Sequence, residues 1–563
     1  GGGDPSRYNV VWTTPSADHA GSMPLGNGDI ALNAWVEPSG DLLFYIGKSD
    51  SWDENGRLLK IGRVRISLDP RPSTPLQAFE QTLDLSTATL QVRYGEGERA
   101  VTVRAWVDAN RPVIRVEVDG RGPTRAVASI ELWRTSRYVL PSLEVSDVMF
   151  GRKDGDGKQV AVTVEPDSVL APRKGRIGWF HHNVASVGPE LTATVQGLNG
   201  FTRPDPLLHR TFGAVIAMQN AVAIDSLRLR SPASTRHLIN VYVVTKHPAS
   251  PGEWLKAVDD VIVADESLPL TIVRPAHELW WEKFWNRSWI HVTTGGTAPD
   301  KRSASDKTPT GSTGQPTEDD AFVVSRAYAL QRFINACAGR GRYPIKFNGS
   351  LLTVPYRDRP GDADYRQWGP GYWWQNTRLP YYTMPAAGDY ELMEPLFRMY
   401  ARDLMPLFRY RTRLYMNHGG AFIPECIYFW GDLFSETYGW TPFEQRTDKQ
   451  QESRWHKWEW VSGLELVWLM MDYYEHTTDQ QFLRETVLPT AHEVLTFFDL
   501  HYPLDENGTM VMHPSQAAET WWECTNPMPE IAGIHAVVDR LASLPEKSAT
   551  AEQRALWSSG THG

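Results

Sequence analysis

The sequence predicts a multidomain protein in which an N-terminal antiparallel β-sandwich is followed by a linker helix and an incomplete (α/α) toroid of helical hairpins. Two observations predict this fold. Apolar residues alternate with a period of two over residues 1–268, and they recur three and four positions apart after residue 321. We therefore expect a β-sandwich domain over 1–268, a linker helix and mobile loop over 269–320, and an (α/α)6-barrel-like domain over 321–563.

The β-sandwich is predicted from short alternating runs separated by turn residues. TLQVRYGEGERAVTVRAWV (89–107) contains two alternating runs around a glycine-containing turn, and VIRVEVDG and HLINVYVVT repeat the pattern. Many short strands with turn signals between them are typical of a sandwich.

The linker and the toroid are predicted from helical periodicity. PAHELWWEKFWNRSWIH (275–291) has aromatic residues at helical spacing, and GGTAPDKRSASDKTPTGSTGQPTED (295–319) is too polar to order itself. Residues 389–411 and 460–477 follow as amphipathic helices, with Asp389 and Asp479 as expected N-caps. A complete (α/α)6 barrel needs twelve helices, whereas residues 321–563 suffice for about four hairpins.

Composition narrows the function classes. The net charge of -10 gives no basic footprint for nucleic acid, and no apolar run reaches the ~18 to 20 residues of a membrane span. Three widely spaced cysteines predict free, mostly buried thiols. The chain starts without Met or a signal peptide, so we expect an upstream export signal and a secreted or periplasmic protein. Oligomeric state is left open.

The stretch HPSQAAETWW (513–522) places one acid, Glu519, between two alanines and two tryptophans. Such an acid is either a helix-end residue facing water or a carboxyl whose proton is held by desolvation. The second environment suits a general acid.

Three loops between the expected helices mix Trp or Tyr with amides and carboxylates: 347–382, 417–432 and 513–527. Loops on a rigid scaffold commonly carry function, and aromatic rings stack on the C–H faces of sugars. His418 and His513 lack a second ligand at i+3 or i+4, so no metal and no cofactor is expected. The residues expected to contact substrate are Trp374, Gln375, Asp364, His418, Trp430 and Trp521.

Several motifs resemble the six-hairpin glycosidases, in particular the α-L-fucosidases of glycoside hydrolase family 95 and their uncharacterised bacterial relatives. They are MPLGNGDIALNAWV (23–36), LLFYIGKSDSWDE (42–54), SRAYALQRFINACAGRGRYPIKFNG (325–349), WWQNTRLPYY (373–382) and HPSQAAE (513–519). The resemblance covers most of the chain and is weak outside these motifs.

This resemblance implies inverting glycoside hydrolysis, with Glu519 as the general acid and Asn376 holding the attacking water. Trp374 stands where the family has a first asparagine, which is a departure. The family's base is an Asp in a late helix that has no match here, so either Glu425 or Asp364 substitutes, the base lies in a missing C-terminal portion, or the chain is inactive. In the simpler interpretations Asn376 caps a helix, Gln375 is a surface amide and Glu425 is a solvated loop acid.

Three other classes compete. A polysaccharide lyase usually has its toroid first in the chain, whereas here the β domain comes first. A disaccharide phosphorylase shares this domain order but needs a phosphate cradle, which no Gly/Ser/Lys loop predicts. A non-catalytic glycan-binding protein needs no base. In each case the expected partner is an oligosaccharide or polysaccharide.

Overall fold

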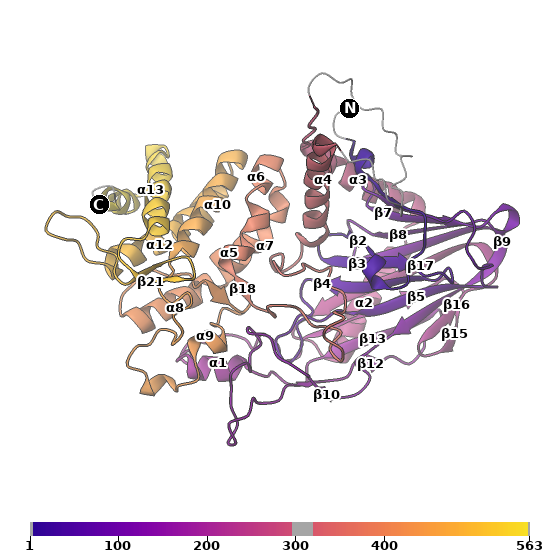
Figure 1. The fold of residues 1–563 in the computed structure, drawn as a ribbon, viewed down its shortest axis with the longest axis horizontal. Helices are drawn as coiled ribbons and strands as arrows, with labels where there is room; N and C mark the ends of the chain where they lie inside the picture. Colours follow the sequence, from indigo (N-terminus) through magenta and orange to yellow (C-terminus); the bar gives the residue numbers. More distant parts are fainter. Residues whose placement is uncertain (1–3, 295–318, 561–563) are drawn as a thin grey trace.

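The computed structural model describes residues 4–294 and 319–560, so the expected mobile loop at 295–319 lies almost wholly outside the described residues. A large antiparallel β-sheet domain is followed by a helical region, and the two lie side by side along the longest axis (Figure 1).

The first sheet is antiparallel throughout, and apolar residues of its two long central strands belong to the main hydrophobic core. In spatial order it consists of β1 (Val10–Trp12), β6 (Glu80–Asp84), β7 (Thr89–Tyr94), β8 (Val101–Val107), β9 (Val113–Glu131), β17 (Ser234–Lys246), β14 (Thr211–Ala217), β13 (Arg176–His182) and β12 (Ser168–Val169).

The second sheet shares β9 with the first. The 19-residue β9 pairs with β8 and β17 along its first part and with the second sheet along its last part. The other strands of that sheet are β2 (Met23–Gly26), β3 (Ile30–Val36), β4 (Leu42–Lys48), β5 (Gly62–Asp69), β16 (Arg228–Arg230) and β15 (Val222–Asp225). Apolar residues from both sheets meet in one core. Short two-stranded pairs complete the strands: β10 (Tyr138–Val139) with β11 (Thr163–Val164) in the β domain, and two pairs in the helical region, β18 (Tyr372–Trp373) with β19 (Cys426–Ile427) and β20 (Ser515–Ala517) with β21 (Trp521–Cys524).

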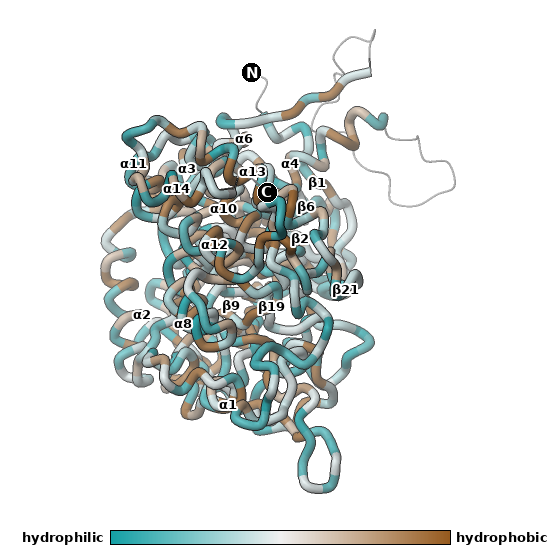
Figure 2. Tube along the Cα trace, turned by 90° about the vertical axis from the view of Figure 1, so that its left-hand side faces the viewer, coloured by the Kyte–Doolittle hydropathy of each residue, from teal (hydrophilic) through white to brown (hydrophobic). Residues whose placement is uncertain are grey.

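The outer face of the first sheet is covered by α2 (Pro251–Glu266), which lies inside the region expected to be purely β. Ser250 and Glu253 form a capping box at its start. Its apolar face, with Trp254, packs on β14 and β17. Every residue of β14 is therefore buried, whereas β5 alternates buried and accessible residues. Figure 2 shows the alternating hydropathy of α2.

The remaining helices, apart from α1 (Pro189–Val195) on a loop of the β domain, connect to or form the helical region. They are α3 (Leu270–Arg287), α4 (Asp320–Ala338), α5 (Trp374–Thr377), α6 (Met384–Ala387), α7 (Glu394–Phe397), α8 (Met405–Met416), α9 (Ser435–Tyr438), α10 (Val461–Thr477), α11 (Gln480–Phe482), α12 (Leu488–His501), α13 (Met528–Ala542) and α14 (Ala551–Gly560), with π-helical turns at Arg398–Asp403 and Leu483–Val487.

Two sequence predictions about helix starts have different outcomes. Asp479 caps α11, because its carboxylate accepts the Phe482 N–H at 3.0 Å. Asp389 makes no capping bond, because its carboxylate is taken up by Arg332 at 2.7 Å and Arg287 at 3.1 Å.

The expected linker helix exists as α3, and the PLGNG loop contacts the helical region. Trp281 of α3 packs on Phe333 of α4 with ring centroids 5.5 Å apart. A Cβ on Gly26 would lie 2.4 Å from the carbonyl oxygen of Cys337 at the end of α4, so only glycine allows this approach. The backbone of Gly28 exchanges hydrogen bonds with Cys337 and Arg340.

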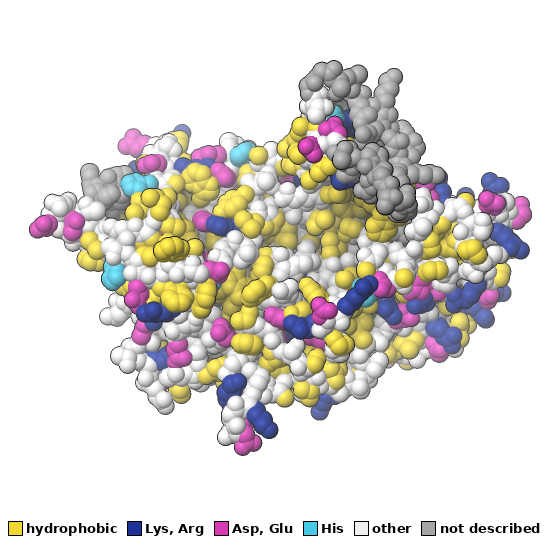
Figure 3. All heavy atoms as spheres, viewed as in Figure 1, with side chains coloured by type: hydrophobic (Ala, Val, Ile, Leu, Met, Phe, Trp, Pro, Cys, Tyr) yellow, Lys and Arg dark blue, Asp and Glu magenta, His cyan; other side chains and the backbone are white. Residues whose placement is uncertain are grey.

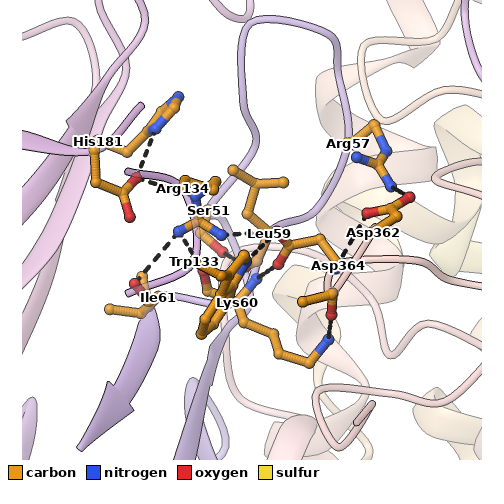
Figure 4. A network of polar contacts seen from close by, with 12 residues as sticks. Ser51, Arg57, Leu59, Lys60, Ile61, Trp133, Arg134, His181, Asp362 and Asp364 are labelled. Carbon is orange, nitrogen blue, oxygen red and sulfur yellow. Dashed lines mark hydrogen bonds and ion pairs between the residues drawn. The ribbon is translucent and has the colours of Figure 1, made fainter. Parts of the chain in front are cut away.

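A buried charge network also joins the two parts (Figure 4). Arg57 pairs with Asp362 at 2.6 Å, and Arg134 pairs with Asp364 at 2.8 Å. Arg134 also forms an ion pair with Asp167 at 3.0 Å, and the same Asp167 oxygen lies 2.9 Å from His181 Nδ1. Each arginine is thus neutralised by acids from its surroundings, as buried charges require.

No helix in the described ranges is long and apolar enough to cross a membrane. The three cysteines are free, with Cys337 and Cys426 buried and Cys524 partly exposed. On the face drawn in Figure 3, basic and acidic side chains are interspersed.

Candidate active site

Acidic side chains from three loops gather at the first turns of α10. They come from the loop before β19 (Cys426–Ile427), from the segment before α10 and from the hairpin formed by β20 (Ser515–Ala517) and β21 (Trp521–Cys524). We call this group the carboxyl cluster. Its members are Glu425, His456, Glu459 and Glu519, and Gln375 of α5 contacts two of them.

Glu425 forms the buried floor of the carboxyl cluster. The pairing of β18 (Tyr372–Trp373) with β19 brings it beside α5, where its Oε1 accepts the Gln375 backbone N–H at 2.6 Å. Its Oε2 accepts the Ser462 hydroxyl at 2.9 Å. The residue is only 1% exposed, and burial, together with the nearby Glu459 charge, raises its pKa to about 8. Glu425 is therefore not the solvated loop acid of the simpler interpretation.

Glu519 is the accessible acid of the carboxyl cluster. Its backbone carbonyl accepts the Trp522 indole N–H at 2.7 Å and the Gln516 amide at 3.2 Å, which fixes the turn. Its carboxylate Oε2 accepts the Gln375 side-chain amide at 3.0 Å. The expected desolvation by neighbouring rings is wrong, because the Glu519 side chain is 44% exposed and Trp521 is 69% exposed.

His456 and Glu459 were missed from the sequence. His456 Nδ1 lies 2.6 Å from Glu459 Oε2, and its Nε2 lies 3.4 Å from Glu519 Oε2. Burial lowers the pKa of His456, and burial with the Glu519 and Glu465 charges raises that of Glu459 to about 8. The available signal was the i, i+3 spacing of a His and a Glu in the polar segment directly before a long apolar helix.

The same residues include a set that could hold a metal ion. Ligand atoms of Glu425, His456 and Glu459, all buried, lie within 4.8 Å of one another. An imidazole with two carboxylates suits a transition metal such as Zn²⁺ or Mn²⁺. The sequence prediction of no metal considered only histidines at i+3 and i+4 and did not weigh this set.

Trp374 does not offer a surface to a sugar. The side chain is fully buried, its ring packs on Tyr400 at 5.1 Å, and its indole N–H donates to Glu465 Oε2 at 3.2 Å. Glu465 also accepts the Tyr382 hydroxyl at 2.8 Å and forms an ion pair with Arg378. The expected substrate contact of Trp374 is therefore replaced by a structural role.

Asp364, proposed as a substrate contact or substitute base, lies in the network between the two parts. Its Oδ1 accepts the Lys60 backbone N–H at 2.9 Å, and its Oδ2 accepts from Trp133 and Arg134. Burial alone would raise the pKa of Asp364, but the Arg134 and Lys60 charges outweigh it and hold this pKa down at about 2. A buried carboxylate with both oxygens engaged is not available to a substrate, so neither role fits.

The other expected residues have different surroundings. Trp430 is buried and stacks on Tyr428 at 4.5 Å, and His418 Nε2 lies 2.9 Å from His501 Nδ1, so neither contacts the carboxyl cluster. Asn376 follows Gln375 in α5 and is half-buried, and its side chain makes no hydrogen bond to another described residue.

Comparison with known proteins places the fold. Residues 11–290 match the model of a domain of unknown function, DUF5703 (its N-terminal part). No curated protein sequence matches the chain. Among solved structures, a putative kojibiose phosphorylase from the human microbiome is similar over 99% of this chain and 69% of its own length, with 9% identity and a TM-score of 0.55.

Two more distant structures have TM-scores of 0.38 and 0.32. They are a bacterial glucoamylase complexed with acarbose (10% identity, 98% of this chain and 68% of that one) and a family 92 glycosyl hydrolase (11% identity, 92% and 68%). The first likeness shows the fold alone: an antiparallel β domain followed by a helical region.

Proposed function

We propose that the chain cleaves glycosidic bonds at the carboxyl cluster, with Glu519 as the general acid. The observation that carries this proposal is that one residue, Gln375, binds two carboxyl groups, Glu425 through its backbone and Glu519 through its side chain. A pair of carboxyl groups is the usual equipment for glycoside hydrolysis. Of the two, Glu519 is the one that a substrate can reach.

In the inverting mechanism that the motif resemblance favours, Glu519 protonates the leaving oxygen while a water attacks the opposite face of the sugar. We propose that Asn376, next to Gln375 and with no described hydrogen-bond partner for its side chain, orients that water. An α-L-fucoside is the first sugar to test, because the quoted motifs resemble that family. We also propose a finer architecture, in which a β-sandwich is followed by a partial toroid of helical hairpins. We propose further that the protein is exported from the cytoplasm.

Neither of the two candidate general bases, Glu425 and Asp364, fits that role. Glu425 holds its proton at neutral pH and has both oxygens engaged, and Asp364 is locked in ion pairs. Neither suits a general base, which must be ionised and in contact with the water. We therefore expect this chain to hydrolyse glycosides slowly. A glycan-binding role without turnover is the main alternative.

Phosphorolysis is the second candidate, since a neighbour in fold is named a putative kojibiose phosphorylase. Phosphate carries negative charge and needs cationic or N–H donors around it. Next to the carboxyl cluster, Arg378 is already paired with Glu465, and the members of the cluster include no lysine or arginine. This charge balance favours water over phosphate as the nucleophile.

The test is a panel of aryl glycosides and oligosaccharides incubated with the protein with and without inorganic phosphate. Hydrolysis predicts release of free sugar that is independent of phosphate, and ¹H NMR should show the inverted anomer first. A sugar phosphate formed only with phosphate would support the phosphorylase. If calorimetry detects glycan binding but no substrate yields a product, the protein is a glycan-binding protein and the proposed cleavage is refuted.

A further inference from the structure

We propose that Trp455 is a stacking platform for the sugar that leaves the site, so that the substrate is an oligosaccharide cleaved between two pyranose rings. This inference rests on the proposed function, because it concerns the leaving side of the bond that Glu519 protonates. Trp455 lies in the segment before α10 and is 45% exposed. A single exposed tryptophan is ordinary, so the surroundings of this one decide whether its ring binds a ligand.

The Trp455 ring lies one aromatic ring away from the turn that carries the acid. It packs edge to face on Trp522, with ring centroids 5.5 Å apart. The Trp522 indole N–H in turn donates to the Glu519 backbone carbonyl at 2.7 Å. A general acid protonates the oxygen that joins the cleaved sugar to the leaving group, so the leaving group lies beside the acid. Trp455 is therefore close enough to contact a ring on the leaving side.

The Glu519 carboxylate is open on the solvent side. Its Oε2 accepts the Gln375 amide at 3.0 Å, whereas its Oε1 makes no hydrogen bond to another described residue. Because the side chain is 44% exposed, a substrate can reach Oε1 from the solvent. Glu519 and Trp455 are thus both exposed, on adjoining loops, where a leaving sugar would pass.

The Trp455 ring is available to a ligand, whereas the Trp522 ring is already in use. Trp522 donates its indole N–H to Glu519, and the Arg454 guanidinium lies over its ring at 5.7 Å. The indole N–H of Trp455 makes no hydrogen bond to a described residue. A flat apolar ring with an N–H to donate suits a pyranose, whose C–H face stacks on the ring and whose hydroxyls accept hydrogen bonds.

The backbone of Trp455 is held on both sides. The Ser453 hydroxyl accepts the Trp455 N–H at 3.2 Å, and the side-chain amide of the buried Gln451 donates to the Trp455 carbonyl. The same Gln451 amide donates to the Ser453 carbonyl at 3.0 Å. A ring on a fixed backbone loses little freedom when a ligand stacks on it, and this favours binding.

The loop that carries Trp455 is also tied to the hairpin that carries the acid. Gln516 is fully buried, and its side-chain oxygen accepts the Trp458 N–H at 3.2 Å. Its side-chain nitrogen donates to the Glu519 carbonyl at 3.2 Å. The platform and the acid therefore keep a fixed spacing, as a sugar that is bound by one and released by the other requires.

The experiment compares Trp455→Ala and Trp455→Phe with the wild type on two substrates that share the cleaved sugar, a disaccharide and the methyl glycoside. Both leaving oxygens need a proton, but only the disaccharide has a leaving ring that can stack. We expect Trp455→Ala to lower kcat/KM for the disaccharide about 10-fold, mainly through a higher KM, and to change that for the methyl glycoside less than about twofold. Trp455→Phe keeps a flat ring and should lose less than about threefold on the disaccharide.

The matched control is Trp289→Ala, at a tryptophan that is 54% exposed and lies among residues of α3, α4 and the N-terminal turn. This variant should keep the wild-type kcat/KM on both substrates. An equal loss on both substrates in Trp455→Ala would overturn the platform and show that the ring only supports the Glu519 turn through Trp522. No loss on the disaccharide, or a greater loss on a 4-nitrophenyl glycoside than on the disaccharide, would also overturn it. The proposed hydrolysis would stand in all three cases.

A second measurement does not depend on turnover. In Glu519→Gln protein, calorimetry should show that adding Trp455→Ala weakens oligosaccharide binding about 10-fold and that adding Trp289→Ala does not change it. If the wild type cleaves no substrate but Trp455→Ala weakens binding, the proposed hydrolysis fails and the platform stands. Equal affinities with and without Trp455→Ala, or no binding of any oligosaccharide, would overturn the platform.

Discussion

Replacing Glu425 with Gln should make the protein more stable at alkaline pH and leave it nearly unchanged in acid. Glu425 has its pKa raised from 4.5 to about 8, chiefly by burial. The folded state therefore binds the proton more tightly than the unfolded state does. The stabilisation is fully present below pH 4.5 and is lost as the pH rises through about 8.

The magnitude follows from the same values. At ~1.36 kcal/mol per pH unit, a pKa moved from 4.5 to about 8 corresponds to at most about 5 kcal/mol of unfolding free energy. Because Glu459 shares the same environment, we expect about 2 to 5 kcal/mol for the single replacement. Gln keeps the shape, accepts the Gln375 N–H and donates to the Ser462 hydroxyl, so it removes the ionisation with little repacking.

The assay is thermal unfolding of the wild type and Glu425→Gln from pH 5 to pH 9. At ~2–4 °C per kcal/mol for a unit the size of the helical region, the variant should unfold at least about 4 °C higher than the wild type at pH 9. At pH 5, only half a pH unit above the unfolded-state pKa of 4.5, the variant should unfold about 2–3 °C higher than the wild type. Glu506→Gln, at an exposed acid, is the control and should show no trend. A difference between Glu425→Gln and wild type that stays constant across this range would refute the reasoning.

Two predictions concern the junction of the two parts. Asp364→Asn removes the charge facing Arg134 and should lower the free energy of unfolding by about 3 kcal/mol, measured as a lower unfolding temperature. The control is Asp358→Asn, at an exposed acid, which should leave the unfolding temperature unchanged. Equal unfolding temperatures for the two variants would show that the network is dispensable. Gly26→Ala should lower the unfolding temperature, because its Cβ would lie 2.4 Å from the Cys337 carbonyl; Gly155→Ala, with open space around it, is the control, and a stable Gly26→Ala protein would mean that the junction yields easily.

The sequence predicted what depends on periodicity. The alternation in 89–107 corresponds to β7 and β8, and the amphipathic pattern in 460–477 corresponds to α10. The expected helix over 389–411 is interrupted instead, because Pro395 and Pro406 start new helical turns around a π-helical stretch.

What the sequence did not predict depends on partners distant in the chain. Asp389 has a suitable N-cap position, but Arg332, more than fifty residues away, takes its carboxylate. Asp364 is similarly taken up by Arg134 of the β domain. The contact between Gln375 and Glu519 is compatible with the motif spacing. Neither His456 nor Glu459 belongs to a recognised motif, and only the fold brings His456 within 3.4 Å of Glu519.

The central claim is that Glu519 is the proton donor in glycoside cleavage. The most direct measurement is kcat/KM of the wild type, Glu519→Gln and Glu523→Gln on the best alkyl glycoside found in the panel. Glu523 lies on the same hairpin with a similarly exposed side chain, 48% against 44%. We expect Glu519→Gln to lose 10²- to 10⁴-fold, the usual contribution of a positioned acid or base, and Glu523→Gln to stay within about threefold of the wild type. Equal activity of the Glu519→Gln variant and the wild type would contradict the account.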